Sequence, residues 1–182
     1  MVDRYVCESL QAEEADRLCQ ACESLEEKLV VWTLLDTGMR VSELCNLKAK
    51  QILRRKKAIR IEGKHSVKRV VPMSKRVQTL LEHYFAINND WPVGPRQAQK
   101  IVKQVASKAK LSRTVTPHML RRTFITLAPQ QGISRAAVNE ILGSNRLSKW
   151  NIAERAANLR SQYNSSEEVF IHMMLQDLGI ID

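Results

Sequence analysis

Apolar residues recur at the spacing of an α-helix over most of the chain. In residues 12–22, for example, Ala15, Leu18, Cys19 and Cys22 fall on one face, which indicates an amphipathic helix packed on a core. The same spacing, together with residues that favour helix ends, predicts nine helices. They cover residues 12–22, 25–37, 41–47, 75–87, 95–108, 118–128, 135–142, 152–161 and 166–178.

Residues with known preferences for helix ends support these bounds. Ser24 and Glu27 form the capping-box pattern that opens a helix, and Gly38 is well placed to end it. Pro95 suits the first position of a helix because its fixed φ angle fits there and its missing N–H is not needed. Further N-cap candidates are Ser74, Ser134 and Ser165.

The pattern changes between residues 51 and 73. Three short β-prone runs separated by turn-like residues replace the helical spacing, at residues 52–53, 58–61 and 69–72. These runs predict a small three-stranded antiparallel sheet. The predicted fold class is therefore α+β and mostly helical, with helices around this sheet in a single domain.

Charge is distributed unevenly along the 182 residues. The net charge is +10, yet residues 48–76 alone contain twelve Lys and Arg and a single acid, Glu62. A basic segment of this kind repels itself unless an anion faces it. Binding of a basic cluster to nucleic acid releases counterions, which favours the complex, so nucleic acid is the first partner to consider.

Composition argues against several other classes of protein. No run of about 18 apolar residues is present, so no membrane span is expected. The first residues lack the apolar stretch of an export signal, so the four cysteines are interpreted as thiols of the cytoplasm. Cys19 and Cys22 are spaced like metal ligands, but no second pair accompanies them, and both are assigned to the core rather than to a metal site. The chain has no Gly-rich phosphate loop, which argues against use of ATP.

Three segments carry residues that suit phosphate chemistry. In TGMRVSEL (37–44), Arg40 follows a Gly break at the start of a helix, where guanidinium and backbone N–H groups can face one anion. In GKHSVKRVVP, Lys64 lies at the tip of a predicted β-hairpin. In PHMLRRTF, His118 and Arg121 are three residues apart on a helix and so lie on one face. A side chain that can transfer a proton is then next to one that can bind an anion.

In this order, the three segments resemble the catalytic domain of the tyrosine recombinases, the phage-integrase and Xer-like family. The segment NEILGS agrees, because the family has a helix ending in Leu-Gly-His at that place. The resemblance runs from about Leu10 to Leu159 and implies the fold of that catalytic domain.

The resemblance also implies an activity and its residues. Members cut one DNA strand with a tyrosine hydroxyl, become linked to the 3′ phosphate, and reseal the strand with another 5′ hydroxyl, without ATP, metal or other cofactor. By position, Arg40 and Arg121 match the two arginines that clamp the scissile phosphate. His118 matches the residue that transfers a proton or bonds the phosphate, and Lys64 the one that protonates the leaving oxygen. Glu43 matches an acid that is usually structural.

Double-stranded DNA is the partner that the resemblance implies. The basic hairpin is expected to lie along the DNA backbone, and the protein to form a dimer or tetramer on DNA, associated with the nucleoid. The residues predicted to contact DNA are Arg54, Arg55, Lys56, Lys57, Lys68, Arg69 and Arg122.

The chain departs from the family pattern after residue 143. Where the family has His, or sometimes Trp, this chain has Ser144, which can bond a phosphate oxygen but cannot carry a proton charge. Trp150 lies nearby in the sequence as an alternative.

The position of the nucleophile leaves two hypotheses open. The run ERAANL resembles the family's Glu-Arg-Tyr-Ala-Asn-Leu and puts Ala156 where the tyrosine belongs. Tyr163, about ten residues beyond the usual spacing, is the remaining candidate nucleophile. The chain is then either an active recombinase that uses Tyr163 or a cleavage-deficient module of the same fold that binds DNA.

Two expectations concern domain organisation. Family members usually carry an N-terminal helical domain that completes a clamp around DNA. Here the catalytic pattern begins near residue 10, so residues 1–182 are expected to form one catalytic domain without it. Residues 166–178 are predicted to pack into a neighbouring subunit, with packing within the same subunit as the alternative.

Overall fold

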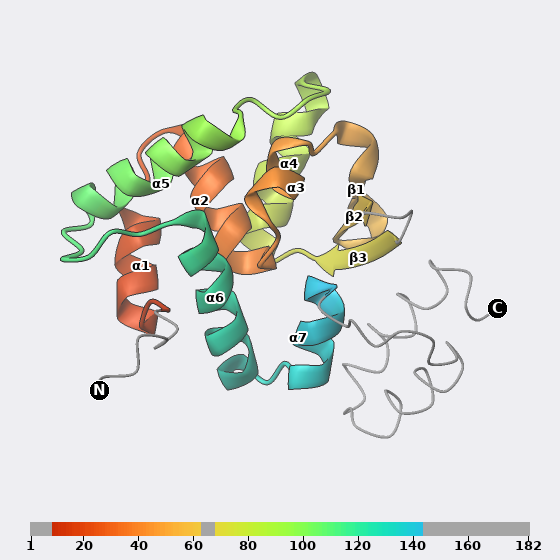
Figure 1. The fold of residues 1–182 in the computed structure, drawn as a ribbon. Helices are drawn as coiled ribbons and strands as arrows, with labels where there is room; N and C mark the ends of the chain where they lie inside the picture. Colours follow the sequence, from red (N-terminus) through yellow and green to blue (C-terminus); the bar gives the residue numbers. More distant parts are fainter. Residues whose placement is uncertain (1–8, 63–67, 144–182) are drawn as a thin grey trace.

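Helix α2 (Leu25–Thr37) forms the centre of the computed structural model, which describes residues 9–62 and 68–143 (Figure 1). Five helices contact or adjoin it: α1 (Ala12–Gln20), α3 (Val41–Cys45), α4 (Lys75–Ile87), α5 (Pro95–Lys108) and α6 (Pro117–Leu127). Leu29, Val30 and Leu34 of α2 are fully buried. The helix is apolar nearly all round because it has neighbours on several sides.

Local signals mark both ends of α2 and the start of α5, as the sequence predicts. The Ser24 hydroxyl accepts a hydrogen bond from the Glu27 backbone N–H, and the Glu27 carboxylate accepts one from the Ser24 N–H. Gly38 then ends α2 with a φ of +60°, the left-handed conformation that glycine adopts without strain. Pro95 opens α5.

Three helices begin or end at residues other than those predicted. Helix α1 stops at Gln20 because the chain turns at Ala21 to reach the N-cap of α2, and α3 stops at Cys45. Helix α6 begins at Pro117 rather than His118, since the Thr116 hydroxyl accepts the N-cap bond from the Met119 N–H. The predicted N-caps of α4 and of α7 (Arg135–Leu142) are confirmed: Ser74 and Ser134.

The predicted three-stranded antiparallel sheet is confirmed. Its strands are β1 (Ile52–Leu53), β2 (Ala58–Glu62) and β3 (Lys68–Pro72), with β2 in the middle. Ile59 of β2 pairs with Val71 of β3, and both side chains belong to the main core. A 3₁₀ turn, Arg54–Lys56, joins β1 to β2, and another, Ala49–Gln51, leads into β1.

Helix α7 packs against β3, and the 3₁₀ turn Ala128–Gln131 joins it to α6. In Figure 1 the sheet and α7 lie together on one side of the helical bundle, away from α1. This arrangement confirms the predicted mostly helical α+β fold. The helices predicted at 152–161 and 166–178 lie outside the described residues, and no described helix has the length and apolar content needed to cross a membrane.

Candidate active site

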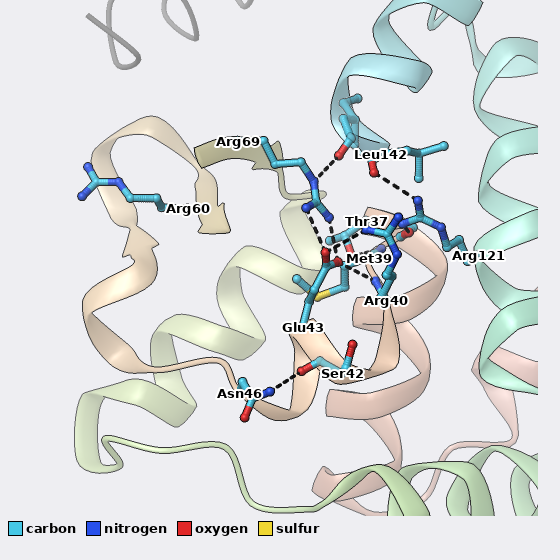
Figure 2. A network of polar contacts seen from close by, with 12 residues as sticks. Thr37, Met39, Arg40, Ser42, Glu43, Asn46, Arg60, Arg69, Arg121 and Leu142 are labelled. Atoms are coloured by element: carbon cyan, nitrogen blue, oxygen red, sulfur yellow. Dashed lines mark hydrogen bonds and ion pairs between the residues drawn. The ribbon is translucent and has the colours of Figure 1, made fainter. Parts of the chain in front are cut away.

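Arginines from three separate parts of the chain meet where α3, β3, α6 and the end of α7 come together (Figure 2). Arg40 is the N-cap residue of α3, Arg69 lies on β3, and Arg121 lies on α6. One carboxylate, Glu43 of α3, lies among them. We call these four residues the arginine cluster.

Arg121 is buried and reaches two backbone carbonyls. Its side chain donates from Nη1 to the Gly38 oxygen at 2.5 Å and from Nη2 to the Leu142 oxygen at 3.1 Å. Burial, and after it the positive charge of Arg40, lower the pKa of this guanidinium to about 10. Arg121 therefore remains charged at neutral pH in a place where a positive charge is costly, and a bound anion would offset that cost.

Arg40 is the exposed member of the cluster, with about half of its side chain accessible. Its Nη1 lies 3.1 Å from Glu43 Oε1, and its backbone N–H donates to Glu43 Oε2 at 2.8 Å. The Gly38 turn ends α2 and places Arg40 at the start of α3, close to Arg121 (Figure 2). The two arginines predicted to clamp one phosphate thus lie next to each other.

Arg69 is engaged within the protein. Its Nη1 and Nη2 donate to the two carboxylate oxygens of Glu43 at 2.9 and 2.7 Å, and its Nε donates to the Ile141 carbonyl at 2.8 Å. With a relative exposure of 8%, its geometry favours a structural role over the predicted contact with DNA. Sequence reasoning missed this role, although the two-residue period of β3 places Arg69 on the same face as the buried Val71.

Glu43 is held in its charged form by these arginines. Burial acts to raise the pKa of the carboxyl group, but the hydrogen bonds and positive charges of Arg69 and Arg40 outweigh burial and lower the pKa below 4.5. The predicted structural role of Glu43 agrees with this geometry. The cluster holds three guanidinium groups and one carboxylate, which bonds Arg40 and Arg69, so its described residues carry a net positive charge that favours an anion.

We expect the substitution Glu43→Gln to lower the free energy of unfolding at pH 7 by about 2 to 3 kcal/mol, because it leaves Arg69 buried without a charge partner. The folded pKa of Glu43 is depressed, so its stabilisation is present above pH 4.5 and is lost as the pH falls through the folded pKa. Urea unfolding from pH 7 to pH 3 should therefore show a smaller loss of stability in the variant than in the wild type. Parallel pH profiles would contradict this assignment.

Of the remaining candidate catalytic residues, only His118 lies in the described part of the chain. His118 is exposed in the first turn of α6, three residues before Arg121. The roles predicted for it are still predictions. Lys64 and Tyr163 lie outside the described residues, as do the positions that depart from the family pattern, Ser144, Trp150 and Ala156.

Four of the seven predicted DNA-contacting residues lie at the β1–β2 turn, while Lys68 and Arg69 belong to β3 and Arg122 to α6. At the turn, Arg54, Arg55 and Lys57 are exposed, and Lys56 is half-buried. Lys57 has a positive φ of 50°, which reverses the chain so that these basic residues project from a tight turn. Arg122 of α6 is half-buried.

Residues 8–152 match the phage integrase family. The tyrosine recombinase XerA of Pyrococcus horikoshii is 30% identical over 162 residues, which are 81% of this chain and 56% of that protein. The tyrosine recombinase XerD of Shewanella oneidensis is 29% identical over 183 residues, with 88% of this chain and 61% of that protein covered. The chain thus spans less than two thirds of the length of these relatives.

Solved structures show the same fold. The crystal structure of XerA recombinase superposes with a TM-score of 0.71 at 24% identity, covering 97% of this chain and 65% of that one. A lambda integrase dimer bound to a COC′ core site gives a TM-score of 0.65 at 21% identity, covering 79% and 60%. With the match over residues 8–152, these similarities show that the chain belongs to the phage integrase family and has the catalytic-domain fold of the tyrosine recombinases.

Proposed function

We propose that the chain is the catalytic domain of a site-specific DNA recombinase that cuts and rejoins DNA strands through a 3′-phosphotyrosine intermediate. The observation that carries the proposal is the convergence of Arg40 and Arg121. They come from segments about 80 residues apart in the chain, and they lie beside each other in a cluster with excess positive charge (Figure 2).

In the proposed reaction, Arg40 and Arg121 bond the non-bridging oxygens of the scissile phosphate. A guanidinium suits this task because its planar set of N–H donors matches two oxygens at once, and its charge offsets the charge that grows in the transition state. Arg121 has N–H groups beyond the two that bond Gly38 and Leu142. In the proposed reaction these groups donate to the phosphate.

The other candidates move protons and form the covalent bond. The Tyr163 oxygen attacks phosphorus, the bond from phosphorus to the 5′ oxygen breaks, and Lys64 gives its proton to that oxygen. His118 bonds the phosphate or takes the tyrosine proton. A second 5′ hydroxyl then attacks the phosphotyrosine and releases the enzyme, so one phosphodiester is exchanged for another without an external energy source.

Double-stranded DNA is the proposed partner, and a dimer or tetramer on DNA the proposed assembly. The exposed Arg54, Arg55 and Lys57 extend the positive surface along the turn that joins β1 to β2. Related structures support this proposal: XerH recombinase bound to difH substrate (TM-score 0.65), and lambda integrase as a dimer on a core site and as a tetramer on a Holliday junction. Association with the nucleoid follows if the proposal is right.

A trap for the covalent intermediate tests the proposal. A library of duplexes with random sequence and one nick lets the short 5′-hydroxyl fragment diffuse away after cleavage, so that the linked enzyme accumulates and survives detergent. We expect an adduct whose peptide carries phosphotyrosine at position 163, and none with Tyr163→Phe. Arg17→Ala, which removes an exposed arginine of α1, should react like the wild type. An adduct at another tyrosine would reassign the nucleophile.

The run of residues around Ala156 favours a second candidate function, DNA binding without cleavage. In that case the protein should bind duplex DNA, with an affinity that falls steeply with salt, at a slope of about −0.9 per phosphate contact on logarithmic axes. No adduct should form with any member of the library. A single phosphotyrosine peptide would exclude this alternative.

A further inference from the structure

Arg69 joins three parts of the site through a single side chain. Its two terminal nitrogens bond Glu43 of α3, while its Nε bonds the carbonyl of Ile141 in the last turn of α7. The side chain starts from β3, so strand, α3 and α7 are fixed to one another at this point (Figure 2). A paired, two-bond contact between guanidinium and carboxylate fixes direction as well as distance.

Glu43, held in this orientation, in turn orients Arg40. The carboxylate oxygen that accepts from Arg69 Nη1 lies 3.1 Å from Arg40 Nη1, and the other oxygen accepts from the Arg40 backbone N–H at 2.8 Å. Glu43 is therefore held by Arg69 on one side and holds both the backbone and the guanidinium of Arg40 on the other. Without Arg69, the half-exposed Arg40 side chain would keep a partner whose own position is no longer fixed.

The end of α7 is held by two arginines at consecutive residues. Arg69 bonds the carbonyl of Ile141, and Arg121 bonds that of Leu142. The next residue, Gly143, has a φ of +61°, and a Cβ built there would lie 3.1 Å from Arg69 Cδ. The stem of Arg69 thus packs over a glycine, which lets the guanidinium lie close to the helix end.

We propose that Arg69 is a positioning residue for the phosphate clamp: through Glu43 it orients Arg40, and through Ile141 it holds the end of α7 on the same frame as Arg121. This inference rests on the proposed function, because it assigns Arg69 to the site where the phosphate is bound. It also replaces the predicted DNA contact of Arg69 with an indirect role.

The test uses the full chain and inorganic phosphate as the probe. Side-chain N–H signals of Arg40 and Arg121, labelled with ¹⁵N and followed by NMR, report on the orientation of each guanidinium and on phosphate binding. The variants are Arg69→Met, which keeps the stem but removes every donor, and Arg69→Lys, which keeps the charge but not the paired contact. Leu18→Ala, a fully buried residue of α1, is a control for loss of stability alone.

We expect Arg69→Met to move the Arg40 signal before phosphate is added and to weaken phosphate binding about fivefold, the size of coupling typical of neighbouring groups. Arg69→Lys should restore part of the affinity. Leu18→Ala should lower the melting temperature and leave both signals and the phosphate affinity unchanged. Glu43→Gln should move the Arg40 signal, and combining it with Arg69→Met should add little, because both act through one contact.

An unmoved Arg40 signal together with an unchanged phosphate affinity in Arg69→Met would overturn the inference. This result is independent of the DNA adduct experiment. If no adduct forms, but phosphate binds and Arg69→Met weakens phosphate binding, the proposal that this chain cleaves DNA is wrong. The proposed positioning role of Arg69 then stands. If phosphate moves neither arginine signal in the wild type, the proposal that Arg40 and Arg121 bind a phosphate is wrong. The Arg40 signal in Arg69→Met, measured without phosphate, then decides whether Arg69 orients Arg40.

Discussion

Replacement of Arg121 by methionine should lower the rate of DNA adduct formation by about 10³-fold or more, since groups that offset transition-state charge contribute that much to phosphoryl transfer. Methionine keeps most of the buried volume but supplies no donor. Arg121→Lys should be nearly as inactive, because one ammonium cannot bond Gly38, Leu142 and a phosphate with the geometry of a guanidinium. Single-turnover adduct formation on a trapped substrate measures the effect.

The stability of the Arg121 variants should separate a role in the reaction from a role in folding. Burial and the charge of Arg40 lower the Arg121 pKa to about 10 from 12.5, so the folded protein carries an unfavourable charge at every pH below that value. Removing the charge relieves this cost, while the carbonyls of Gly38 and Leu142 lose their donor. These effects oppose each other, so the free energy of unfolding should change by about 1 kcal/mol or less. A large loss of stability would show that Arg121 mainly supports the fold.

Phosphate should stabilise the wild type and not Arg121→Met. An anion that binds only the folded state raises stability by mass action, and the arginine cluster has more positive than negative charge among its described groups. The exposed Arg17 provides the matched control, because Arg17→Met removes the same kind of side chain on α1, away from the cluster.

Much of the fold follows from local signals in the sequence. The capping box at Ser24, the glycine at position 38 and the proline at position 95 each act through neighbours within a few residues. They therefore set both bounds of α2 and the first residue of α5. The alternation of β-prone runs with turns sets the order of the three strands in the same local way. The pairing of Arg40 with Arg121 has another source, because it is the resemblance of the three motifs to the tyrosine recombinases that implies it.

The contacts inside the arginine cluster could not be derived in this way. Arg69 and Glu43 are 26 residues apart, and Arg121 bonds the carbonyl of Gly38 across 83 residues. Every residue has a backbone carbonyl, so the sequence does not indicate which carbonyl accepts a hydrogen bond from a distant arginine. The charge pattern even favoured another outcome, since Arg69 belongs to a basic segment that was predicted to face DNA as a whole. The structure instead pairs Arg69 with Glu43 and leaves 8% of the residue exposed.

Gly38→Ala should lower the free energy of unfolding by about 3 kcal/mol, from left-handed backbone strain and overpacking together. Gly38 has a φ of +60°, and a Cβ at this position would lie 2.4 Å from Phe124 Cδ1 and 3.0 Å from Leu142 Cδ2. Phe124 is buried, so its ring cannot simply swing into solvent. Urea unfolding measures the loss.

Gly132→Ala is the matched control. Gly132 also has a positive φ, +93°, but a Cβ there would meet nothing within 4 Å. It should therefore show only the backbone part of the cost, about 1 kcal/mol. If the two variants were equally destabilised, packing against Phe124 would contribute nothing at position 38.

The Gly38 variant should also affect the site, and Gly132→Ala should not. Phe124 lies one turn after Arg121 on α6, and the Gly38 carbonyl is an acceptor for Arg121. A methyl group at position 38 pushes on that helix and on Leu142, whose carbonyl is the second acceptor. Phosphate affinity measured where both variants are fully folded should thus fall in Gly38→Ala alone. The glycine that ends α2 therefore supports the arginine cluster, because the close approach of α6 that it permits keeps its carbonyl within hydrogen-bonding distance of Arg121.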